Sequence, residues 1–424
     1  MNLYYINAFR NINSDLQGST KSLLSQYCQS RNNADTELDS VKTILEGSST
    51  QLNKLPFIPD IAQKIQKKGV DIAGKYFSFP ISISFLSDFD TDAWSQMNLF
   101  FNPAIGHNIP IQILGLGQKN ILYLSLFIAE LENSSQAHEI NILLIEEPEA
   151  HLHPQLQKIL FANLNDLKTT QVFMTSHSTH IASDCNYKNL NILFKNMRNQ
   201  VKSFAPFKNG VLSARENSLL KRYLDATRSE MFFASAIIYV EGVAEQFILP
   251  AIAKEIYDIN LTEHNISVIP IHSRYFDPYL KIVQNTNLEI PVAAVIDGDA
   301  DEWIDNFATT AIVSAQTLEV KERVQVFVGI QTLEVDLFPD SKTNAIYLKK
   351  CFDNLGHGQS YQNLLTATEE DEKLWPGELL RRIDKTIKKG RFAQELSLLI
   401  DDEFTAPRYL EAAIEHIITA KKIR

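Results

Sequence analysis

Short, almost wholly apolar runs recur along this chain of 424 residues. Runs of this length and composition are typical of strands that are buried on both faces. They are found at residues 141–145, 171–175, 236–240, 266–271, 292–296 and 324–328. Longer segments between them, such as residues 155–167 and 244–256, carry apolar side chains at helical spacing. Strands that alternate with helices predict an α/β fold with a mainly parallel sheet.

A polar, basic stretch at residues 188–228 separates two halves of the chain, and we expect a domain boundary at its end. A chain of this length holds roughly two to three domains at about 150 residues each. From residue 344 onward the pattern is mostly helical. We therefore expect three parts, at residues 1–228, 229–340 and 341–424.

Composition narrows the class of protein. Hydrophobic residues make up 45% and charged residues 21%, which is typical of a folded globular protein. The net charge is -11, so contact with nucleic acid would need a local basic surface or bound cations. Cys28, Cys185 and Cys351 lack a metal-type spacing, which argues against a disulfide scaffold or zinc site. With no bilayer-length apolar stretch and no signal pattern, we expect a soluble, cytoplasmic protein without a membrane partner.

The first candidate site lies where the apolar run ILLI ends in the string EEPEAHLHP. Nucleotide hydrolases need one carboxylate for Mg²⁺ and a second that polarises the attacking water. Glu146 and Glu147 would take these two roles. The next predicted strand is followed by TSHS, which places His177 where ABC-type ATPases have a histidine that reaches the γ-phosphate. We interpret His151 and His153 as structural, since no third metal ligand accompanies them.

Upstream of this strand, the string GLGQKN precedes a predicted helix. Gly115 and Gly117 allow close approach of the backbone, and the helix N-terminus offers free N–H groups to an anion. Together with Gln118, they resemble the signature loop that binds the γ-phosphate of a partner subunit. The order of these strings, rather than any one of them, indicates an ATPase-like half-site.

A phosphate-cradling P-loop is missing from the sequence. Such a loop has the pattern G-x-x-x-x-G-K-S/T, in which backbone N–H groups wrap the phosphates. The nearest string, LQGSTKSLL, has Gly18 and Lys21, but Asp15 and Thr20 stand where glycines are required. No buried strand is expected before it. ATP binding would therefore need a P-loop supplied by another chain.

A second set of carboxylates follows the predicted strands of the second half. Because the carboxyl ends of parallel strands meet at one edge of a sheet, these side chains should converge there. Hard divalent cations such as Mg²⁺ or Mn²⁺ prefer oxygen ligands of this kind, and two of them can catalyse phosphodiester cleavage. The candidate ligands are Glu241, Glu245, Asp297, Asp299, Glu334 and Asp336. The string KKGRFA adds Lys388, Lys389 and Arg391 as candidates for contacting the scissile phosphate.

The pattern E-G-x-x-E after one strand and D-x-D after a later one resembles the Toprim domain of topoisomerases, primases and some nucleases. An EEPEAHLHP and TSHS segment followed in one chain by a Toprim segment resembles the OLD family of ATP-dependent nucleases. The resemblance implies a partial ABC-type ATPase lobe, then a Toprim domain with a mainly parallel sheet and a helical C-terminal region.

The same resemblance implies a metal-dependent DNA endonuclease that forms a homo-oligomer and acts in anti-phage defence. It assigns catalytic roles to Glu241, Asp297, Asp299 and Lys389, with Lys388 as the alternative to the last. Since family members open with a strand and P-loop, a partner protein that carries the Walker A half is one explanation of its absence. The others are a truncated gene and a nuclease that works without ATP.

Two further hypotheses compete with a nuclease. One is a regulatory or interaction protein whose Toprim site is inactive, although the full set of acidic residues argues against a decayed site. The other is a topoisomerase or primase. No setting for a tyrosine nucleophile and no zinc-binding segment accompanies the Toprim part, which disfavours that option.

Overall fold

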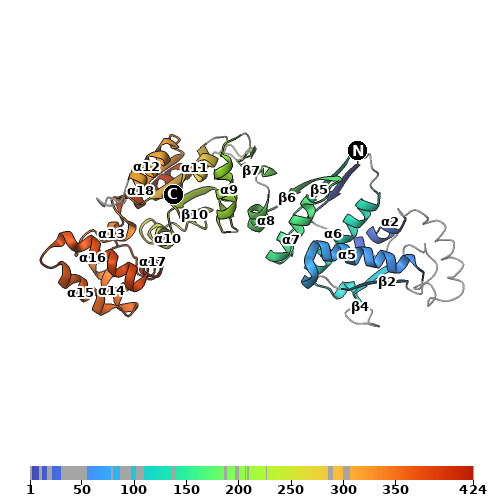
Figure 1. Cartoon of the computed structure of the whole chain (residues 1–424), viewed down its shortest axis with the longest axis horizontal. Helices are drawn as coiled ribbons and strands as arrows, with labels where there is room; N and C mark the ends of the chain where they lie inside the picture. The colour runs from blue at the N-terminus through green and yellow to red at the C-terminus, as the bar shows by residue number, and fades with distance from the viewer. Residues whose placement is uncertain are drawn as a thin grey trace. The chain divides into compact units, whose positions relative to one another are not determined.

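The computed structural model separates the chain into two compact units, Met1–Asp184 and Cys185–Arg424. Figure 1 draws both units. The structure describes residues 2–8, 12–16, 22–29, 55–77, 80–85, 97–101, 109–134, 140–185, 189–195, 200–205, 207, 210–225, 227–284, 290–298 and 306–423. The chain passes from the first unit to the second after residue 184. The domain boundary expected at residue 228 stays a prediction.

A three-stranded parallel sheet in the order β1-β5-β6 forms the centre of the first unit. Its strands are β1 (Asn2–Ile6), β5 (Asn141–Glu146) and β6 (Thr170–Thr175). The predicted strands at residues 141–145 and 171–175 are thus confirmed. β1 was not expected, because its residues alternate between buried and exposed positions instead of forming an apolar run.

Helices pack on this sheet and on one another around a core that includes Ile6, Leu143 and Ile145. The long helices are α5 (Phe57–Phe77), α6 (Leu116–Ser134) and α7 (Pro154–Asn165), and the short ones are α1 (Ile12–Leu16), α2 (Leu23–Gln29) and α8 (Thr179–Asp184). An antiparallel sheet of β2 (Ile81–Phe85), β3 (Met97–Phe101) and β4 (Ile109–Pro110) lies beside α5.

A four-stranded, fully parallel sheet in the order β10-β9-β11-β12 organises the second unit. Its strands are β9 (Ala236–Val240), β10 (Ile266–Pro270), β11 (Val292–Ile296) and β12 (Val324–Val328), as the apolar runs predict. Every residue of the two central strands, β9 and β11, is buried. This burial explains why their sequences are continuous apolar runs.

Helices connect and cover these strands. Those around the sheet are α9 (Ala214–Tyr223), α10 (Val243–Tyr257), α11 (Asp277–Gln284), α12 (Asn306–Thr317) and α18 (Arg408–Lys421). The helical C-terminal region contains α13 (Leu333–Leu337), α14 (Ala345–Asn354), α15 (Gly358–Thr368), α16 (Trp375–Arg382) and α17 (Lys389–Ser397). A hairpin of β7 (Ile192–Lys195) and β8 (Val201–Phe204) precedes α9. The predicted α/β fold with a mainly parallel sheet and a helical C-terminal region is therefore confirmed.

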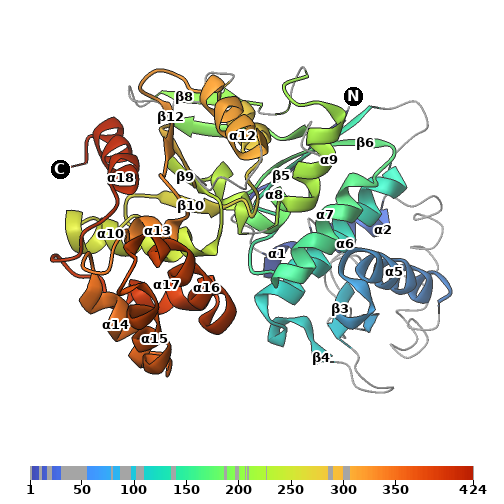
Figure 2. The same ribbon diagram turned by 60° about the vertical axis from the view of Figure 1, so that its left-hand side comes forward.

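Helix α18 returns from the C-terminal region and packs on β11 and β12, while α10 packs on α17. In both ribbon views α10, α13 and α17 lie side by side (Figures 1 and 2). This packing brings residues from the end of the chain to the sheet edge at which β9 and β11 finish. None of the described helices combines the length and the apolar composition needed to cross a membrane.

Candidate active site

Glu241 and Glu245 flank the junction between strand β9 and helix α10. Glu241 follows the last residue of the strand, and Gly242 is the N-cap of the helix. Glu245 folds back, and its Oε2 accepts a hydrogen bond from the Gly242 N–H at 3.0 Å. Only 4% of Glu245 is exposed. The spacing E-G-x-x-E thus places one carboxylate at the strand end and buries another in the first turn of the helix, where it satisfies a helix-end N–H group.

Asp297 occupies the corresponding position after the neighbouring strand, β11. Its backbone N–H donates a hydrogen bond to Glu241 Oε1 at 3.0 Å, which ties the two strand ends together. Gly298 follows, and a Cβ at that position would lie 2.1 Å from the carbonyl oxygen of Gly329. Only glycine permits this close approach of the two loops. Asp299, the second acid of the predicted D-x-D pair, lies outside the described residues.

Glu334 and Lys389 approach the strand ends from the helical C-terminal region. Lys389 Nζ lies 2.9 Å from Glu334 Oε2, and 2% of Glu334 is exposed. A carboxylate this deeply buried is stable as an ion only when a cation pairs with it. Of the two neighbouring lysines, both of which the structure describes, Lys389 lines the pocket and Lys388 does not.

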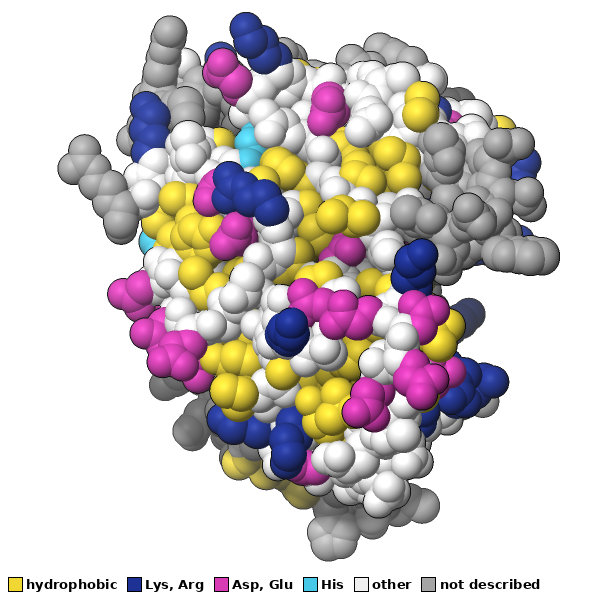
Figure 3. All heavy atoms as spheres, turned by 90° about the vertical axis from the view of Figure 1, so that its left-hand side faces the viewer, with side chains coloured by type: hydrophobic (Ala, Val, Ile, Leu, Met, Phe, Trp, Pro, Cys, Tyr) yellow, Lys and Arg dark blue, Asp and Glu magenta, His cyan; other side chains and the backbone are white. Residues whose placement is uncertain are grey.

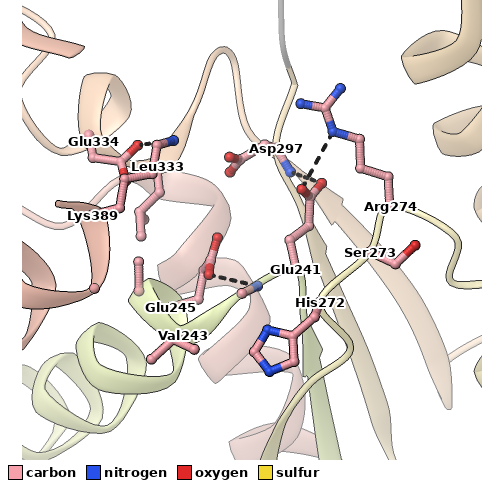
Figure 4. A pocket seen from close by; sticks show the side chains of 13 residues that line it. Glu241, Val243, Glu245, His272, Ser273, Arg274, Asp297, Leu333, Glu334 and Lys389 are labelled. Carbon is pink, nitrogen blue, oxygen red and sulfur yellow. Dashed lines mark hydrogen bonds and ion pairs between the residues drawn. The ribbon is translucent and has the colours of Figure 1, made fainter. Parts of the chain in front are cut away.

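Glu241, Glu245, Asp297, Glu334 and Lys389 all line one pocket of about 600 Å³, shown in Figure 4. The pocket also contains His272, Ser273 and Arg274, from the loop that follows β10. Arg274 Nε lies 3.7 Å from Glu241 Oε2. Sequence reasoning missed this loop. The signal that could have found it is its place after another strand of the same parallel sheet.

The carboxylates of the pocket oppose one another's ionisation. Burial, followed by the charges of Glu245, Glu241 and Glu334, raises the pKa of Asp297 to about 9. Burial and the charge of Glu334 likewise raise the pKa of Glu245. Burial is the largest influence on Lys389 and alone would lower its pKa, but the charge of Glu334, the hydrogen bond with it and the charges of Asp384 and Asp297 together raise the pKa. Excess negative charge in a buried place is relieved by protons or by a bound cation.

The donor set has the chemistry of a site for a hard divalent cation. Asp297 Oδ1 is buried and finds no hydrogen-bond partner within the described part of the chain. Its neighbours Glu241, Glu245 and Glu334 also offer carboxylate oxygens, the ligands that Mg²⁺ and Mn²⁺ prefer. Among the residues that the structure describes, no three His, Cys, Asp or Glu side chains come close enough together to share one ion. The residues present fit a cation by their chemistry and by the Asp297 oxygen that no described residue satisfies.

Asp336 has a different environment from Glu334. Its carboxylate accepts hydrogen bonds from the backbone N–H groups of Ile330 and Gln331, at 2.9 and 3.0 Å. These bonds hold the turn between β12 and α13, the same turn that approaches Gly298. Glu334 lines the pocket, whereas Asp336 shapes the loop beneath it.

Basic side chains do not gather into one continuous patch on the face shown in Figure 3, where Lys and Arg are scattered among acidic and apolar groups. The basic groups of the pocket, Arg274 and Lys389, each pair with one of its acids. The site therefore offers isolated cationic contacts next to a cluster of carboxylates.

In the first unit, the structure brings Glu147 and His177 together. Glu147 Oε1 lies 3.4 Å from His177 Nε2. The neighbouring Glu149 is buried, and one of its oxygens accepts hydrogen bonds from the Ser176 hydroxyl at 2.6 Å and the His177 N–H at 2.9 Å. Burial and the proximity of Glu149 raise the pKa of Glu147. Glu146 is held separately, by the hydroxyl of Tyr5 on β1 at 2.7 Å.

The GLGQKN string packs directly on the turn that follows β5. A Cβ on Gly117 would lie 2.5 Å from the carbonyl oxygen of His151, so the two backbones touch. The side chain of Gln118 turns back to accept a hydrogen bond from the Gly115 N–H at 3.3 Å. His153 caps helix α7 by accepting from a backbone N–H, which is a structural role. Gly18, Thr20 and Lys21 of the P-loop-like string lie outside the described residues.

Comparison with known proteins matches both units to families. Residues 1–182 match the AAA ATPase domain family, and residues 232–299 match the TOPRIM domain of proteins like the overcoming lysogenization defect protein. The chain is a homologue of the OLD-type nucleases. An AAA ATPase domain followed by an OLD-like TOPRIM domain is the arrangement that the motif order predicts.

Two curated relatives of the OLD type align with parts of the chain. Endonuclease GajA of Bacillus cereus (strain HuB5-5) is 31% identical over 228 residues, which cover 46% of this chain and 32% of GajA. The OLD nuclease of Thermus scotoductus is 27% identical over 144 residues, or 32% of this chain and 27% of that nuclease. The matched region thus spans about a third of the length of these relatives.

Among solved structures, the C-terminal region of the Burkholderia pseudomallei OLD protein is 31% identical. The match covers 45% of this chain and 99% of that structure, with a TM-score of 0.39. The C-terminal region of the Xanthomonas campestris OLD protein is 29% identical, covering 46% of this chain and 97% of that structure, with a TM-score of 0.36.

Proposed function

We propose that this chain is a divalent-metal-dependent DNA endonuclease of the OLD type, which nicks or cleaves phosphodiester bonds. The observation that carries the proposal is the convergence of Glu241 and Asp297, from adjacent strand ends, with buried Glu245 and with Lys389 in one pocket. The similarity to nucleases supports the class of reaction.

In this proposal Glu241, Glu245, Asp297 and Asp299 hold Mg²⁺ or Mn²⁺, and Glu334 or Asp336 completes the site. Glu334 is favoured over Asp336, because the latter already accepts two backbone hydrogen bonds. When bound, divalent cations supply electrostatic stabilisation of the charge that develops on a phosphodiester during cleavage. Lys389 and Arg274 bind and orient the phosphate, since both are cationic and line the same pocket.

The ATPase-like unit serves assembly or regulation. Glu146 takes the role of magnesium ligand, Glu147 that of general base, and His177 that of γ-phosphate sensor. The approach of Glu147 Oε1 to within 3.4 Å of His177 Nε2 supports a coupled function for these two residues. ATP binding would use a P-loop supplied in trans, by a partner protein that carries the Walker A half. Homo-oligomerisation and a role in anti-phage defence are further parts of the proposal.

The test is incubation of the purified chain with supercoiled plasmid and Mg²⁺ or Mn²⁺, with and without ATP. We expect nicking that depends on metal and that falls more than about 100-fold in Asp297→Ala. Even the mutation of a residue that only hydrogen-bonds to a metal ligand lowers activity by up to about 100-fold. Asp402→Ala, at an exposed aspartate outside the pocket, is the matched control. Full cleavage by Asp297→Ala would show that this pocket is not the active site.

The response to ATP distinguishes two forms of the proposal. Nicking that needs Asp297 but ignores ATP would identify a free-standing Toprim nuclease. If no condition gives nicking, the alternative is a regulatory or interaction protein that needs a partner to supply the P-loop.

A further inference from the structure

A second pocket, of about 410 Å³, lies in the second unit beside the candidate active site. Helix α9, the segment between β10 and α11 and the first turn of α11 line it. Three of its lining residues are aromatic, and we call it the tyrosine pocket after Tyr223, Tyr275 and Tyr279. Ser273 lines both this pocket and the candidate active site. A volume of this size is ordinary for a small-molecule or nucleoside site.

Tyr279 supplies a buried polar group that none of the described residues satisfies. Only 3% of this residue is exposed, and its hydroxyl is buried with no hydrogen-bond partner in the part of the chain that the structure describes. Buried tyrosine hydroxyls normally have a partner, because an unsatisfied polar group is costly. Burial raises the pKa of Tyr279 to about 12, so the hydroxyl remains a hydrogen-bond donor at neutral pH. A ligand with an acceptor atom would satisfy it.

Tyr275 is held in place at the rim of the pocket. Its hydroxyl donates to Glu216 Oε1 at 3.1 Å, and the same oxygen accepts from Lys281 Nζ at 2.6 Å. Glu216 is 5% exposed and also forms a capping box with Ser213 at the start of α9. Tyr275 and Tyr223 remain 38% and 39% exposed. The pocket therefore presents aromatic surface to a ligand from a prearranged position.

The sequence Ser273, Arg274 and Tyr275 forms the wall between the two pockets. Arg274 lines the candidate active site and approaches Glu241, while the next residue, Tyr275, lines the tyrosine pocket. A DNA strand that placed a phosphate beside Arg274 would bring the adjoining nucleoside within reach of Tyr275. Nucleobases bind to proteins chiefly by stacking on aromatic rings and by hydrogen bonds to their edges.

We propose that the tyrosine pocket binds the nucleoside of a nucleotide, with its base stacked on Tyr275 and hydrogen-bonded to Tyr279. Because the pocket lies beside the candidate active site, we favour an unpaired nucleotide of the DNA strand being cut as the source of this nucleoside. This inference rests on the proposed nuclease function. A free nucleotide offers the same chemistry and is the other source to be distinguished.

Binding is measured with the full chain in EDTA, so that no cleavage is needed. The probe is a single-stranded oligonucleotide that contains 2-aminopurine, whose fluorescence falls when the base stacks on an aromatic ring. Tyr275→Ala should weaken binding about tenfold and abolish the quenching, in line with the loss of one stacked base. Tyr279→Phe removes only the hydroxyl and should weaken binding less. Tyr257→Ala, at a tyrosine outside both pockets, is the control.

Competition with free deoxyadenosine monophosphate separates the two sources. Binding of the oligonucleotide, but not of the free nucleotide, in a manner that depends on Tyr275 supports the DNA strand as the source. Tyr275-dependent binding of the free nucleotide alone supports a nucleoside pocket and overturns the DNA strand as its source. Equal affinity of both tyrosine variants and the unaltered chain overturns the pocket itself.

The two proposals can fail separately. If the chain shows no metal-dependent cleavage but still quenches the 2-aminopurine fluorescence, the proposed nuclease function is overturned and the proposed nucleoside pocket is retained. Conversely, if Tyr275→Ala cleaves DNA with an unchanged KM, the proposed nucleoside pocket is overturned and the proposed nuclease function is retained.

Discussion

The backbone N–H of Asp297 donates a hydrogen bond to the carboxylate of Glu241 at 3.0 Å. This single bond joins the ends of two neighbouring parallel strands and holds two acidic side chains at the same sheet edge. Asp297 is left with a buried oxygen that lacks a hydrogen-bond partner among the described residues. The fold thus maintains a concentration of negative charge that has a cost in the absence of a cation.

The stability of the metal-free chain should decline with rising pH because of Asp297. Its pKa is 3.8 in the unfolded reference and about 9 in the folded state. Between these values the folded state keeps a proton on Asp297 that the unfolded state has lost. The contribution of Asp297 to stability is therefore fully present below about pH 4 and is lost progressively toward pH 9, by up to about 1.4 kcal/mol per pH unit. Urea unfolding in EDTA across this range measures the effect.

Asp297→Asn is the control for this pH dependence, since it removes the titrating group with little change of shape. Its unfolding midpoint should fall less steeply with pH than that of the unaltered chain. Parallel curves for the two proteins would contradict the raised pKa.

Lys389→Met should lower metal-dependent cleavage by about 100-fold, the cost of losing one charge-stabilising donor in an active site. The substitution also leaves buried Glu334 without its cation, so the melting temperature should fall. Lys388→Met is the matched control, because Lys388 does not line the pocket. Equal loss of cleavage in the two variants would show that Lys389 is not the residue that specifically contacts the phosphate.

Gly298→Ala should destabilise the second unit by about 1–3 kcal/mol, the usual effect of forcing an extra methyl group into a packed site. The new Cβ would lie 2.1 Å from the Gly329 carbonyl oxygen, and the loop that carries Asp297 would have to move. Cleavage should fall as well. Gly377→Ala, where a Cβ meets no described atom within 4 Å, should be neutral or stabilising in helix α16. Denaturant unfolding of both variants provides the comparison.

Gly117→Ala tests the packing of the signature-like string in the first unit. Its Cβ would lie 2.5 Å from the His151 carbonyl oxygen, whereas the nearest atom to a Cβ on Gly115 is 3.9 Å away. We expect Gly117→Ala to lower the unfolding free energy of this unit by about 1–3 kcal/mol and Gly115→Ala to change it little. Comparable stability of the two variants would show that this contact is not made in solution.

Strand-end chemistry could be read from the sequence because it follows from local order along the chain. Glu241 and Asp297 each come directly after an apolar run, and such runs are buried strands wherever they occur in a parallel sheet. Glu245 is equally accessible to this reasoning, since the first turn of a helix lies at a set distance from the strand end. Arg274 was missed because its loop carries no acidic residue to draw attention to the end of β10.

The sequence by itself determined the class of fold, the order of the ATPase-like and Toprim-like parts and the strand-end carboxylates, because hydrophobic periodicity and residue spacing are local properties. The tertiary structure alone decided the pairing of Glu334 with Lys389, the position of Arg274 beside Glu241 and the burial of the Tyr279 hydroxyl away from any hydrogen-bond partner among the described residues. It also paired β1 with β5, whose partner residues Asn2 and Asn141 are 139 positions apart along the chain. These contacts join residues that are distant along the chain, and only the packing of helices and strands around a shared core brings them together.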